Sequence, residues 1–350
     1  MKTLKLILTT SILSTSLLAL EPMAKEPGWS GFVLMGTGGV KYKSNEVAGN
    51  RIIDVEDKTI NGYNSPSSES AAIPVINGNA RYTFNQQKTE FFVGNSLENF
   101  LRMDTNIALG IRHSFKDIGI IGVRFLASVT PTDVWEDPFL TGTSRQDTER
   151  TSAGIGIKWE NIFDSNFEID LRSRKIEFDD DRNGEALINN GLAGTDAGLG
   201  GGAMYITDVQ QKVLERDADL NSIELLYTFK LNNSHMLIPS LKSTLQDADG
   251  DARDYSRADI KLTHLYIDKK WMIASNIHVG HSEYDDRNPI FNKKQDTDFI
   301  GGGINITYKN IFSLDNWNLN SGFYAAEGDS DIDFYDTEIV MFTIGMAYRF

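Results

Sequence analysis

Residues 119–129 read GIIGVRFLASV, and residues 150–159 read RTSAGIGIKW. In both stretches large apolar residues alternate with small, polar or charged residues, from Ile121 to Val129 and from Ala153 to Trp159. Strict alternation of this kind is typical of a β-strand with one apolar face and one polar face. Neither stretch has the period of a helix, about 3.6 residues, so the two together favour an all-β fold.

The same alternation recurs along the whole chain and predicts fourteen strands. The connections between them alternate between short turns, such as Lys116–Asp117, and longer loops, such as 179–218. Transmembrane barrels have tight periplasmic turns at one rim and larger extracellular loops at the other. The sequence therefore predicts an antiparallel up-and-down transmembrane β-barrel of about fourteen strands, with twelve or sixteen as alternatives. The strands are expected at 29–42, 75–84, 89–96, 105–115, 119–130, 150–159, 165–178, 219–231, 236–246, 255–267, 271–282, 297–308, 315–325 and 337–350.

The overall composition hides this membrane character. The 350 residues include 34 Lys+Arg and 49 Asp+Glu, for a net charge of −15, with 40% hydrophobic residues and no cysteine. The acidic balance argues against a nucleic-acid partner, and the lack of cysteine excludes a disulfide scaffold and thiolate-ligated metals. A barrel needs only its outer face to be apolar, because inter-strand hydrogen bonds satisfy the backbone and the lumen can be wet.

Both ends of the chain carry signals of export to the outer membrane. Residues 1–20 combine Lys2 and Lys5 with an apolar stretch, which predicts a secretory signal peptide and leaves 21–350 as a single barrel domain. The last strand ends on Tyr348 and Phe350, which is similar to the C-terminal signal that the assembly machinery of outer-membrane barrels reads. Aromatic residues gather beside the short turns, as in the interfacial girdles of barrels. We expect the protein in the outer membrane of a Gram-negative bacterium, with lipid, lipopolysaccharide and the assembly machinery as partners.

The polar face of each strand is expected to line the lumen, if the apolar face meets lipid. The charged candidates on that face are mostly basic, and Lys41 is counted among them, whereas the loops are acidic. Rings of Arg and Lys give wide pores a preference for anions. Arg–carboxylate pairs that brace a closed interior are the alternative. The principal pore-lining candidates are Arg81, Arg112, Arg124, Lys158, Arg172, Arg174, Glu224, Lys230, Arg257, Asp259 and Lys261.

Three loop features are weaker indicators of chemistry. Asp247, Asp249 and Asp251 start like a calcium loop, but the Gly and Glu that such a loop needs later are missing. We expect weak surface binding of Ca²⁺ or Mg²⁺ there at most, and no cofactor. The loop 179–218 either constricts the pore or stays outside it. His281 lies near acidic residues, but a nucleophile, base and orienting group within reach of one another are not evident, and no enzyme activity is expected.

Four stretches resemble, as a set, a bacterial family of outer-membrane proteins known as domain of unknown function 2860. They are GWSGFVLMGTGG at 28–39, TDVWEDPFLTGTSR at 132–145, NPIFNKKQDTD at 288–298 and DSDIDFYDTE at 329–338. The resemblance implies a cell-envelope location and supplies no reaction or ligand. From the residues, we expect a porin-like passive diffusion channel for small polar or anionic solutes. The alternatives are a non-conducting surface barrel, whose acidic loops make cation-bridged contacts with lipopolysaccharide or cells, and a surface hydrolase.

Overall fold

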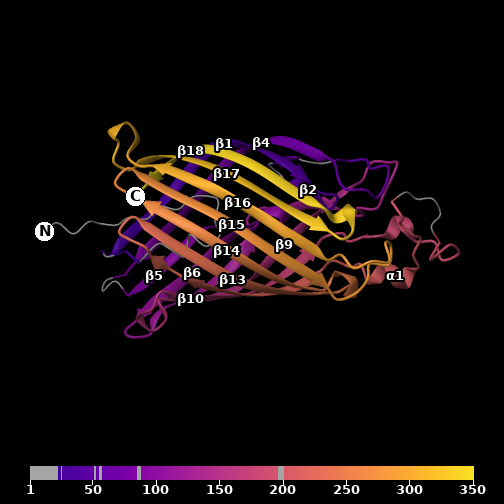
Figure 1. Ribbon diagram of the computed structural model, residues 1–350, viewed down its shortest axis with the longest axis horizontal. Helices are drawn as coiled ribbons and strands as arrows, with labels where there is room; N and C mark the ends of the chain where they lie inside the picture. Colours follow the sequence, from indigo (N-terminus) through magenta and orange to yellow (C-terminus); the bar gives the residue numbers. More distant parts are fainter. Residues whose placement is uncertain (1–22, 25, 51–52, 55–56, 85–87, 196–200) are drawn as a thin grey trace.

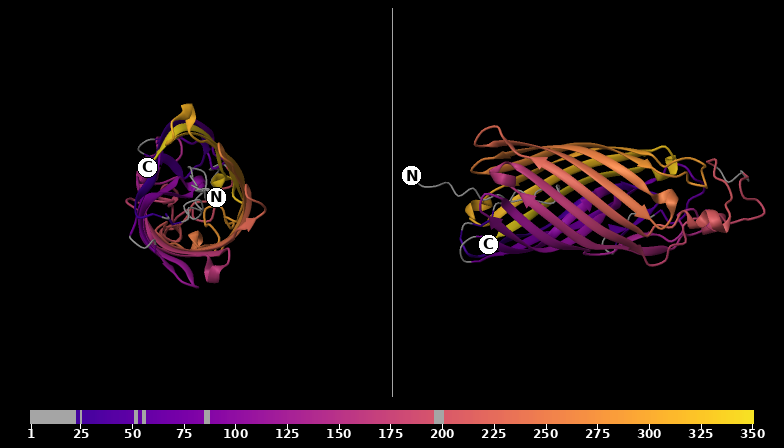
Figure 2. Two further views of the ribbon diagram at one scale, coloured as in Figure 1. Left: turned by 90° about the vertical axis from the view of Figure 1, so that its left-hand side faces the viewer. Right: turned by 90° about the horizontal axis from the view of Figure 1, so that it is seen from below.

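Fourteen antiparallel wall strands form one sheet that closes on itself (Figures 1 and 2). The computed structural model of the protein describes residues 23–24, 26–50, 53–54, 57–84, 88–195 and 201–350. Each wall strand pairs with its neighbours in the sequence, and β1 (Gly28–Lys43) pairs with β18 (Thr337–Arg349) to close the barrel. The predicted fold class and strand count are confirmed. The predicted signal peptide at 1–20 lies outside the described residues.

The remaining elements fall into wall strands, short loop strands and single turns of helix. No helix in the described part of the chain is long and apolar enough to cross a membrane. Strands β11 (Ala218–Tyr227) and β12 (Phe229–Lys230) together make one wall strand. The other wall strands are β4 (Ser68–Thr83), β5 (Thr89–Asn99), β6 (Asp104–Phe115), β7 (Gly119–Ser128), β9 (Asp147–Glu160), β10 (Phe167–Phe178), β13 (His235–Ala248), β14 (Tyr255–Ile267), β15 (Trp271–Tyr284), β16 (Thr297–Tyr308) and β17 (Trp317–Ser330). The loops contain β2 (Val47–Asn50), β3 (Ile53–Asp54), β8 (Thr132–Trp135), α1 (Asp208–Lys212), η2 (Phe100–Arg102), η3 (Ile162–Asp164), η4 (Glu185–Leu187), η5 (Asp251–Arg253), η6 (Ile311–Ser313) and η7 (Asp333–Tyr335).

The outer face of the wall is apolar. Large side chains such as Phe125, Ile155 and Leu245 are exposed on it, which water would disfavour and hydrocarbon accepts. At the rim that carries the short turns, aromatic rings pack in pairs between adjacent strands, with centroid separations of 4.7 Å for Trp271–Tyr308 and 5.1 Å for Trp317–Tyr348. This is the interfacial girdle that the sequence predicts.

The two turns containing η3 and η6 share the sequence Asn-Ile-Phe and the same backbone shape. Asn161 and Asn310 have φ values of 52° and 54°, and the following Phe163 and Phe312 have values of 50° and 55°. Asn tolerates the left-handed region, whereas a bulky residue rarely adopts it. The tight reversal holds both phenylalanines exposed at the periplasmic rim.

The outer end of the β5–β6 hairpin leaves the wall and turns into the lumen. β4 pairs with β5 only between Asn79 and Thr83, so the outer half of β4 has no partner in β5. Beyond this point β8 pairs with β9, and β2 pairs with β8, which continues the wall. The tip of the hairpin, residues 100–103, contacts β17 and β18. We call these four residues the inturned tip.

The inturned tip packs on an apolar part of the inner wall. Leu101 and Met103 join a buried cluster with side chains of β1, β4, β17 and β18, and the Tyr42 hydroxyl donates a 2.6 Å hydrogen bond to the carbonyl oxygen of Leu101. In β1 the residues of this cluster alternate with exposed Val33 and Met35. Both faces of β1 are therefore apolar, one toward lipid and one toward the tip.

The other long loops share a hydrophobic core at the outer rim, which we call the cap core. The described part of the loop 179–217 supplies four of its residues, and its α1 lies beyond the end of the barrel in Figure 1. Of the two predicted alternatives, the external position therefore describes the α1 part of the loop, whereas Arg216 returns to the outer lumen. Loops that pack together in this way are held by apolar burial as well as by their polar contacts. The cap core consists of Ile60, Tyr63, Phe139, Leu187, Ala203, Ile206, Leu214, Ala252, Ile290, Ile332, Phe334 and Tyr335.

Closure of the sheet brings β1 and β18 together tightly at Gly36. A Cβ atom on Gly36 would lie 2.2 Å from the carbonyl oxygen of Ile344, whereas one on Gly39 would meet only the Ala71 oxygen at 4.0 Å. We expect Gly36→Ala to lower the free energy of unfolding by about 1–3 kcal/mol, because the backbone of the closing strands has to shift. Gly39→Ala is the matched control. Urea unfolding in lipid vesicles, followed by tryptophan fluorescence, measures both, and equal effects would contradict the tight closure.

Candidate functional site

A ladder of ion pairs covers the inner wall from β5 to β14. Near the periplasmic end the Nε of Arg112 donates to Glu90 at 2.8 Å, and its Nη1 lies 3.3 Å from Glu160. Lys158 is 3.1 Å from Glu160 and 3.0 Å from Glu168. All of these side chains are buried, which means that they lie against one another more than against free solvent.

The ladder continues toward the outer rim. Arg124 and Arg172 both reach Asp170, at 2.7 and 2.9 Å, and Lys261 reaches Glu224 at 3.1 Å. Burying ionised groups is costly unless each is paired and hydrogen-bonded, and this arrangement meets that condition. The last step is Arg257, whose Nη2 is 2.5 Å from Asp259 and whose guanidinium carbon is 3.7 Å from the ring centroid of Phe299.

Glycines on the inner face give these long side chains their room. A Cβ atom on Gly156 would lie 3.0 Å from the guanidinium carbon of Arg124. One on Gly154 would lie 2.1 Å from the carbonyl oxygen of Ser173 and 2.8 Å from the Cγ of Arg174, so there the close approach of the β10 backbone also requires glycine. The Gly-Ile alternation at 154–157 therefore presents isoleucine to lipid and clearance to the arginines.

The predicted wall residues lie on the inner face, but not all of them join the ladder. Arg174 donates to the hydroxyl of Ser152 at 3.3 Å, and no carboxylate of the described residues lies within ion-pair distance of it. Arg81 is half-buried on β4, and Lys230, opposite Met236, stands exposed at the periplasmic rim. Whether any of these residues lines an open pore stays a prediction.

The prediction for Lys41 is wrong. Its side chain is half-exposed on the outer face, 3.6 Å from Glu338, because the inner face of β1 is the apolar surface that holds the inturned tip. Glu160, Asp104 and Arg150, which the predicted set leaves out, point inward. The excess of basic over acidic residues on the wall is therefore smaller than the sequence suggests.

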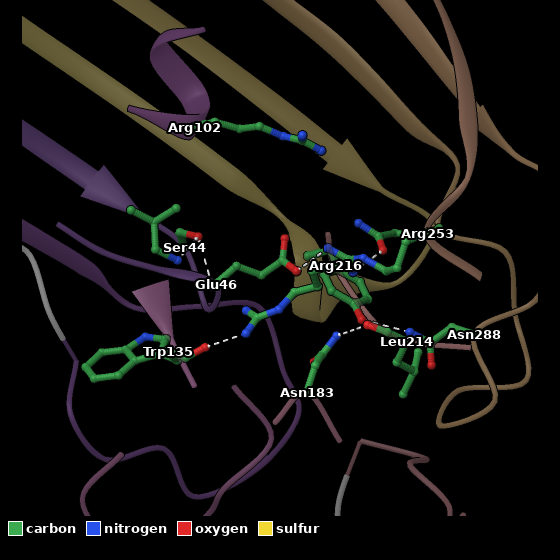
Figure 3. Close-up of polar contacts among 12 residues, drawn as sticks. Ser44, Glu46, Arg102, Trp135, Asn183, Leu214, Arg216, Arg253 and Asn288 are labelled. Atoms are coloured by element: carbon green, nitrogen blue, oxygen red, sulfur yellow. Dashed lines mark hydrogen bonds and ion pairs between the residues drawn. The ribbon is translucent and has the colours of Figure 1, made fainter. Parts of the chain in front are cut away.

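Beyond the ladder, the outer part of the lumen contains a cavity of about 80 Å³, which we call the arginine chamber. Its lining comes from the wall, the inturned tip and the cap loops together. Among the described residues, one carboxylate, Glu46, lines it, against five arginines. Figure 3 shows Glu46 with three of these arginines, Arg102, Arg216 and Arg253. The arginines are Arg102, Arg150, Arg216, Arg253 and Arg257.

Each of the loop arginines is fixed by more than one contact. Arg253 donates to Glu46 at 2.5 Å and to the side-chain oxygen of Gln295 at 3.1 Å. Arg216 donates to Asp181 at 2.8 Å and to the carbonyl oxygen of Trp135 at 3.0 Å, as Figure 3 shows for Trp135. These contacts join loops far apart in the sequence and hold the cap above the chamber.

Arg102 reaches across the lumen from the inturned tip. Its Nη1 donates to the side-chain oxygen of Gln246 at 3.2 Å, and its guanidinium carbon lies 5.5 Å from the ring centroid of Tyr255. Arg150 supports it from β9 by donating to the Arg102 carbonyl oxygen and, at 2.6 Å, to Asp104. Among the described residues no carboxylate forms an ion pair with Arg102.

The electrostatics of the chamber favour negative charge. Burial by itself would raise the pKa of Glu46, but the guanidinium groups of Arg253, Arg216 and Arg102 hold that pKa below its ordinary value of 4.5. A carboxylate placed here stays ionised because positive charge surrounds it. A negatively charged solute in the chamber would experience the same field.

The other predicted sites do not assemble. Asp247 lies on the outer face of β13, Asp249 is exposed beyond it, and Asp251 begins η5. In the part of the chain that the structure describes, no three His, Asp or Glu side chains are grouped so that they could hold a metal ion. His281 is 2.8 Å from Asp298 on the outer face, and none of its contacts in the described chain is a hydrogen bond to a hydroxyl. That the protein is not an enzyme stays a prediction.

The sequence-based set contains Arg257 but misses the loop residues that line the chamber. Glu46, Arg102, Arg216 and Arg253 lie in predicted loops, where charged residues are ordinarily solvated. One signal was present, because Leu101 and Met103 are apolar residues on both sides of Arg102 in a segment expected to face water.

Comparison with known proteins gives a family and a fold likeness. Residues 28–349 match the family described as "Protein of unknown function (DUF2860)". No curated protein matches the sequence. A solved FadL homologue of Pseudomonas aeruginosa has a TM-score of 0.42 at 10% identity, covering 92% of this chain and 90% of that one. The outer membrane channel DcaP of Acinetobacter baumannii has a TM-score of 0.42 at 9% identity, covering 92% and 98%. A loop-deletion mutant of OmpT, an outer membrane protein of Vibrio cholerae, has a TM-score of 0.40 at 11% identity, covering 92% and 100%.

The barrel itself places the protein in the outer membrane of a Gram-negative bacterium. The sheet closes on itself through β1 and β18, its outer face is apolar, and an aromatic girdle marks the periplasmic interface. In the outer membrane, lipid chains cover this apolar surface. The predicted location is confirmed.

The ion-pair ladder is expected to be needed for stability. Replacing Arg112 by Leu leaves Glu90 buried without its main partner, and breaking a buried pair in this way costs about 3–5 kcal/mol of unfolding free energy. Arg174→Leu is the matched control, since Arg174 is equally buried and should lose about 0.5–1.5 kcal/mol with its one hydrogen bond. Urea unfolding of the refolded barrel measures both, and similar losses would show that the ladder pairs add nothing.

Contact between the cap and the wall is expected to weaken in acid. Because the pKa of Glu46 is lower in the folded protein than in the unfolded chain, its stabilising contribution is complete above about pH 4.5 and declines as the pH falls through the lowered value. Hydrogen exchange of residues 44–50, corrected for the intrinsic rate, should therefore accelerate in acid. Glu46→Gln should exchange faster already at neutral pH and lose this pH dependence, and an unchanged profile in the variant would assign the effect to other groups.

Proposed function

We propose that the chain, which belongs to the DUF2860 family, is a porin-like channel for the passive diffusion of small polar or anionic solutes. The observation that carries the proposal is the arginine chamber, where five guanidinium groups and one carboxylate line the outer lumen. Guanidinium groups stay charged at all physiological pH values and attract anions in narrow, low-dielectric passages.

The solutes that suit this barrel are small. A barrel of fourteen strands is wide enough for an aqueous lumen, but the inturned tip and the ladder occupy part of it. The free space in the chamber, about 80 Å³, has room for a few water molecules or one small solute. Large solutes are therefore expected to be excluded at the level of the inturned tip.

A non-conducting surface barrel is the second candidate, and the cap core favours it. Loops packed around Phe139 and Phe334, both fully buried, form a cover at the outer rim rather than separate solvated loops. In that case the acidic loops would present a surface for cation-bridged contacts with lipopolysaccharide or cells, and the lumen would only brace the wall.

Ion conduction in planar lipid bilayers under a KCl gradient separates the two candidates. We expect discrete current steps with a reversal potential on the anion-selective side, since the chamber concentrates chloride over potassium. The double variant Leu101→Ser with Met103→Ser should conduct more than the wild type, because it loses the apolar contacts that hold the inturned tip against the wall. Leu192→Ser, a change at an exposed loop position, is the control and should leave the conductance unchanged.

Two results would overturn the channel proposal. One is firm cation selectivity of the wild-type steps. The other is the absence of steps from both the wild type and the double variant after folding is verified by heat-modifiable gel mobility, and this second result would support the non-conducting barrel.

A further inference from the structure

We propose that the arginine chamber is a binding site for one small oxyanion, a phosphate or a short carboxylate, and that Arg102 is the residue that recognises it. The inference rests on the proposed channel function, which brings the solute to the chamber, and it adds the chemical class of the solute and the residue that selects it.

The arginines of the chamber have more N–H donors than their protein contacts use. A guanidinium group has five N–H donors, and Arg102 spends one nitrogen, Nη1, on Gln246. Arg257 uses Nε and Nη2 on Asp259, and Arg253 uses Nη1 and Nη2 on Gln295 and Glu46. The remaining nitrogens of these three arginines are not fully enclosed by protein atoms, so they retain access to open space. The chamber therefore has donors left over for a solute.

The five chamber arginines outnumber the carboxylates that pair with them. Four of the five arginines have one carboxylate each within ion-pair distance, and these carboxylates are Glu46, Asp181, Asp104 and Asp259. Arg102 is the exception among the described residues. The charge of Arg102 is thus opposed only from beyond ion-pair distance, by Asp104 and Glu46. A bound anion in this confined space would be attracted to it more strongly than in bulk water.

The shape of the donor groups and the size of the cavity suit an oxyanion. The fork of N–H groups on a guanidinium matches two oxygen atoms of a carboxylate or phosphate through two parallel hydrogen bonds, whereas a halide offers a single acceptor atom. The remaining lining includes hydroxyl groups, such as those of Ser282 and Thr337, and apolar side chains, such as Val47 and Val134. A cavity of about 80 Å³ with this lining suits a small oxyanion and excludes a sugar or a peptide.

The inturned tip holds Arg102 in place before a ligand binds. The tip that carries Arg102 is held by the Tyr42 hydroxyl on the Leu101 carbonyl oxygen at 2.6 Å and by the buried contacts of Leu101 and Met103. The Thr132 hydroxyl donates to the Met103 carbonyl oxygen at 3.3 Å from the other side. A group fixed before the ligand arrives loses less entropy on binding, which raises affinity.

Equilibrium dialysis of the full-length, refolded barrel in detergent tests this site without any need for conduction. The probes are radiolabelled inorganic phosphate and succinate in a chloride buffer, with glucose as the neutral probe. We expect saturable binding of one phosphate or one succinate per barrel and no binding of glucose. Arg102→Gln should weaken binding by about 10- to 100-fold, the loss expected for charge-assisted hydrogen bonds. Arg174→Gln, which changes a wall arginine outside the chamber lining, should bind like the wild type.

The results separate this proposal from the channel proposal. If the wild type binds neither anion saturably, the oxyanion site is overturned even where bilayer currents are anion-selective. If Arg102→Gln and Arg174→Gln weaken binding equally, recognition belongs to the wall as a whole and the role of Arg102 is overturned. If Arg102→Gln does not fold, the wild-type stoichiometry still decides, because more than one bound anion per barrel contradicts a single site. Phosphate binding without succinate binding, or the reverse, supports the site and identifies its ligand.

Discussion

The structure depends on one constraint, that every wall strand in lipid has a hydrogen-bonded partner on both sides. β1 meets this requirement through β4 on one side and β18 on the other, and the backbone of Phe350 adds reciprocal bonds to Gly31 at 3.1 and 3.0 Å. Where β5 leaves β4, the same constraint calls for a substitute, and the loop strands β2 and β8 extend the wall from β9. The irregular part of the barrel is thus a consequence of turning the outer end of one hairpin out of the sheet.

That displaced hairpin organises the inside of the barrel. Its apolar residues need an apolar surface, and the inner faces of β1 and β18 supply it. Arg102 then extends to the opposite wall, and the cap loops place Arg216 and Arg253 around the same space. Charged ladder, apolar patch and chamber therefore occupy different sectors of one lumen, and a solute would meet the chamber first from outside and the ladder next.

The sequence was sufficient for the wall and insufficient for the interior. The strands could be predicted because alternation is local and lipid imposes it, so that the pattern at 150–159 identifies β9 by itself. The rule that the apolar face meets lipid failed at Lys41, since the tip also demands an apolar face there. The chamber depends on contacts such as Arg253 with Glu46, which are 207 residues apart in the chain, and no local pattern reports them.

The cap core has a consequence for how this protein can vary. Surface loops of barrels ordinarily tolerate change one at a time, because each is surrounded by water. Here Phe139, Ile206, Ile290 and Phe334 come from four separate loops and are all fully buried in one cluster, so a substitution in any loop alters the packing of the others. Diversification of the outer surface is therefore coupled between loops, and independent change is left to exposed stretches such as those around Leu192 and Gly142.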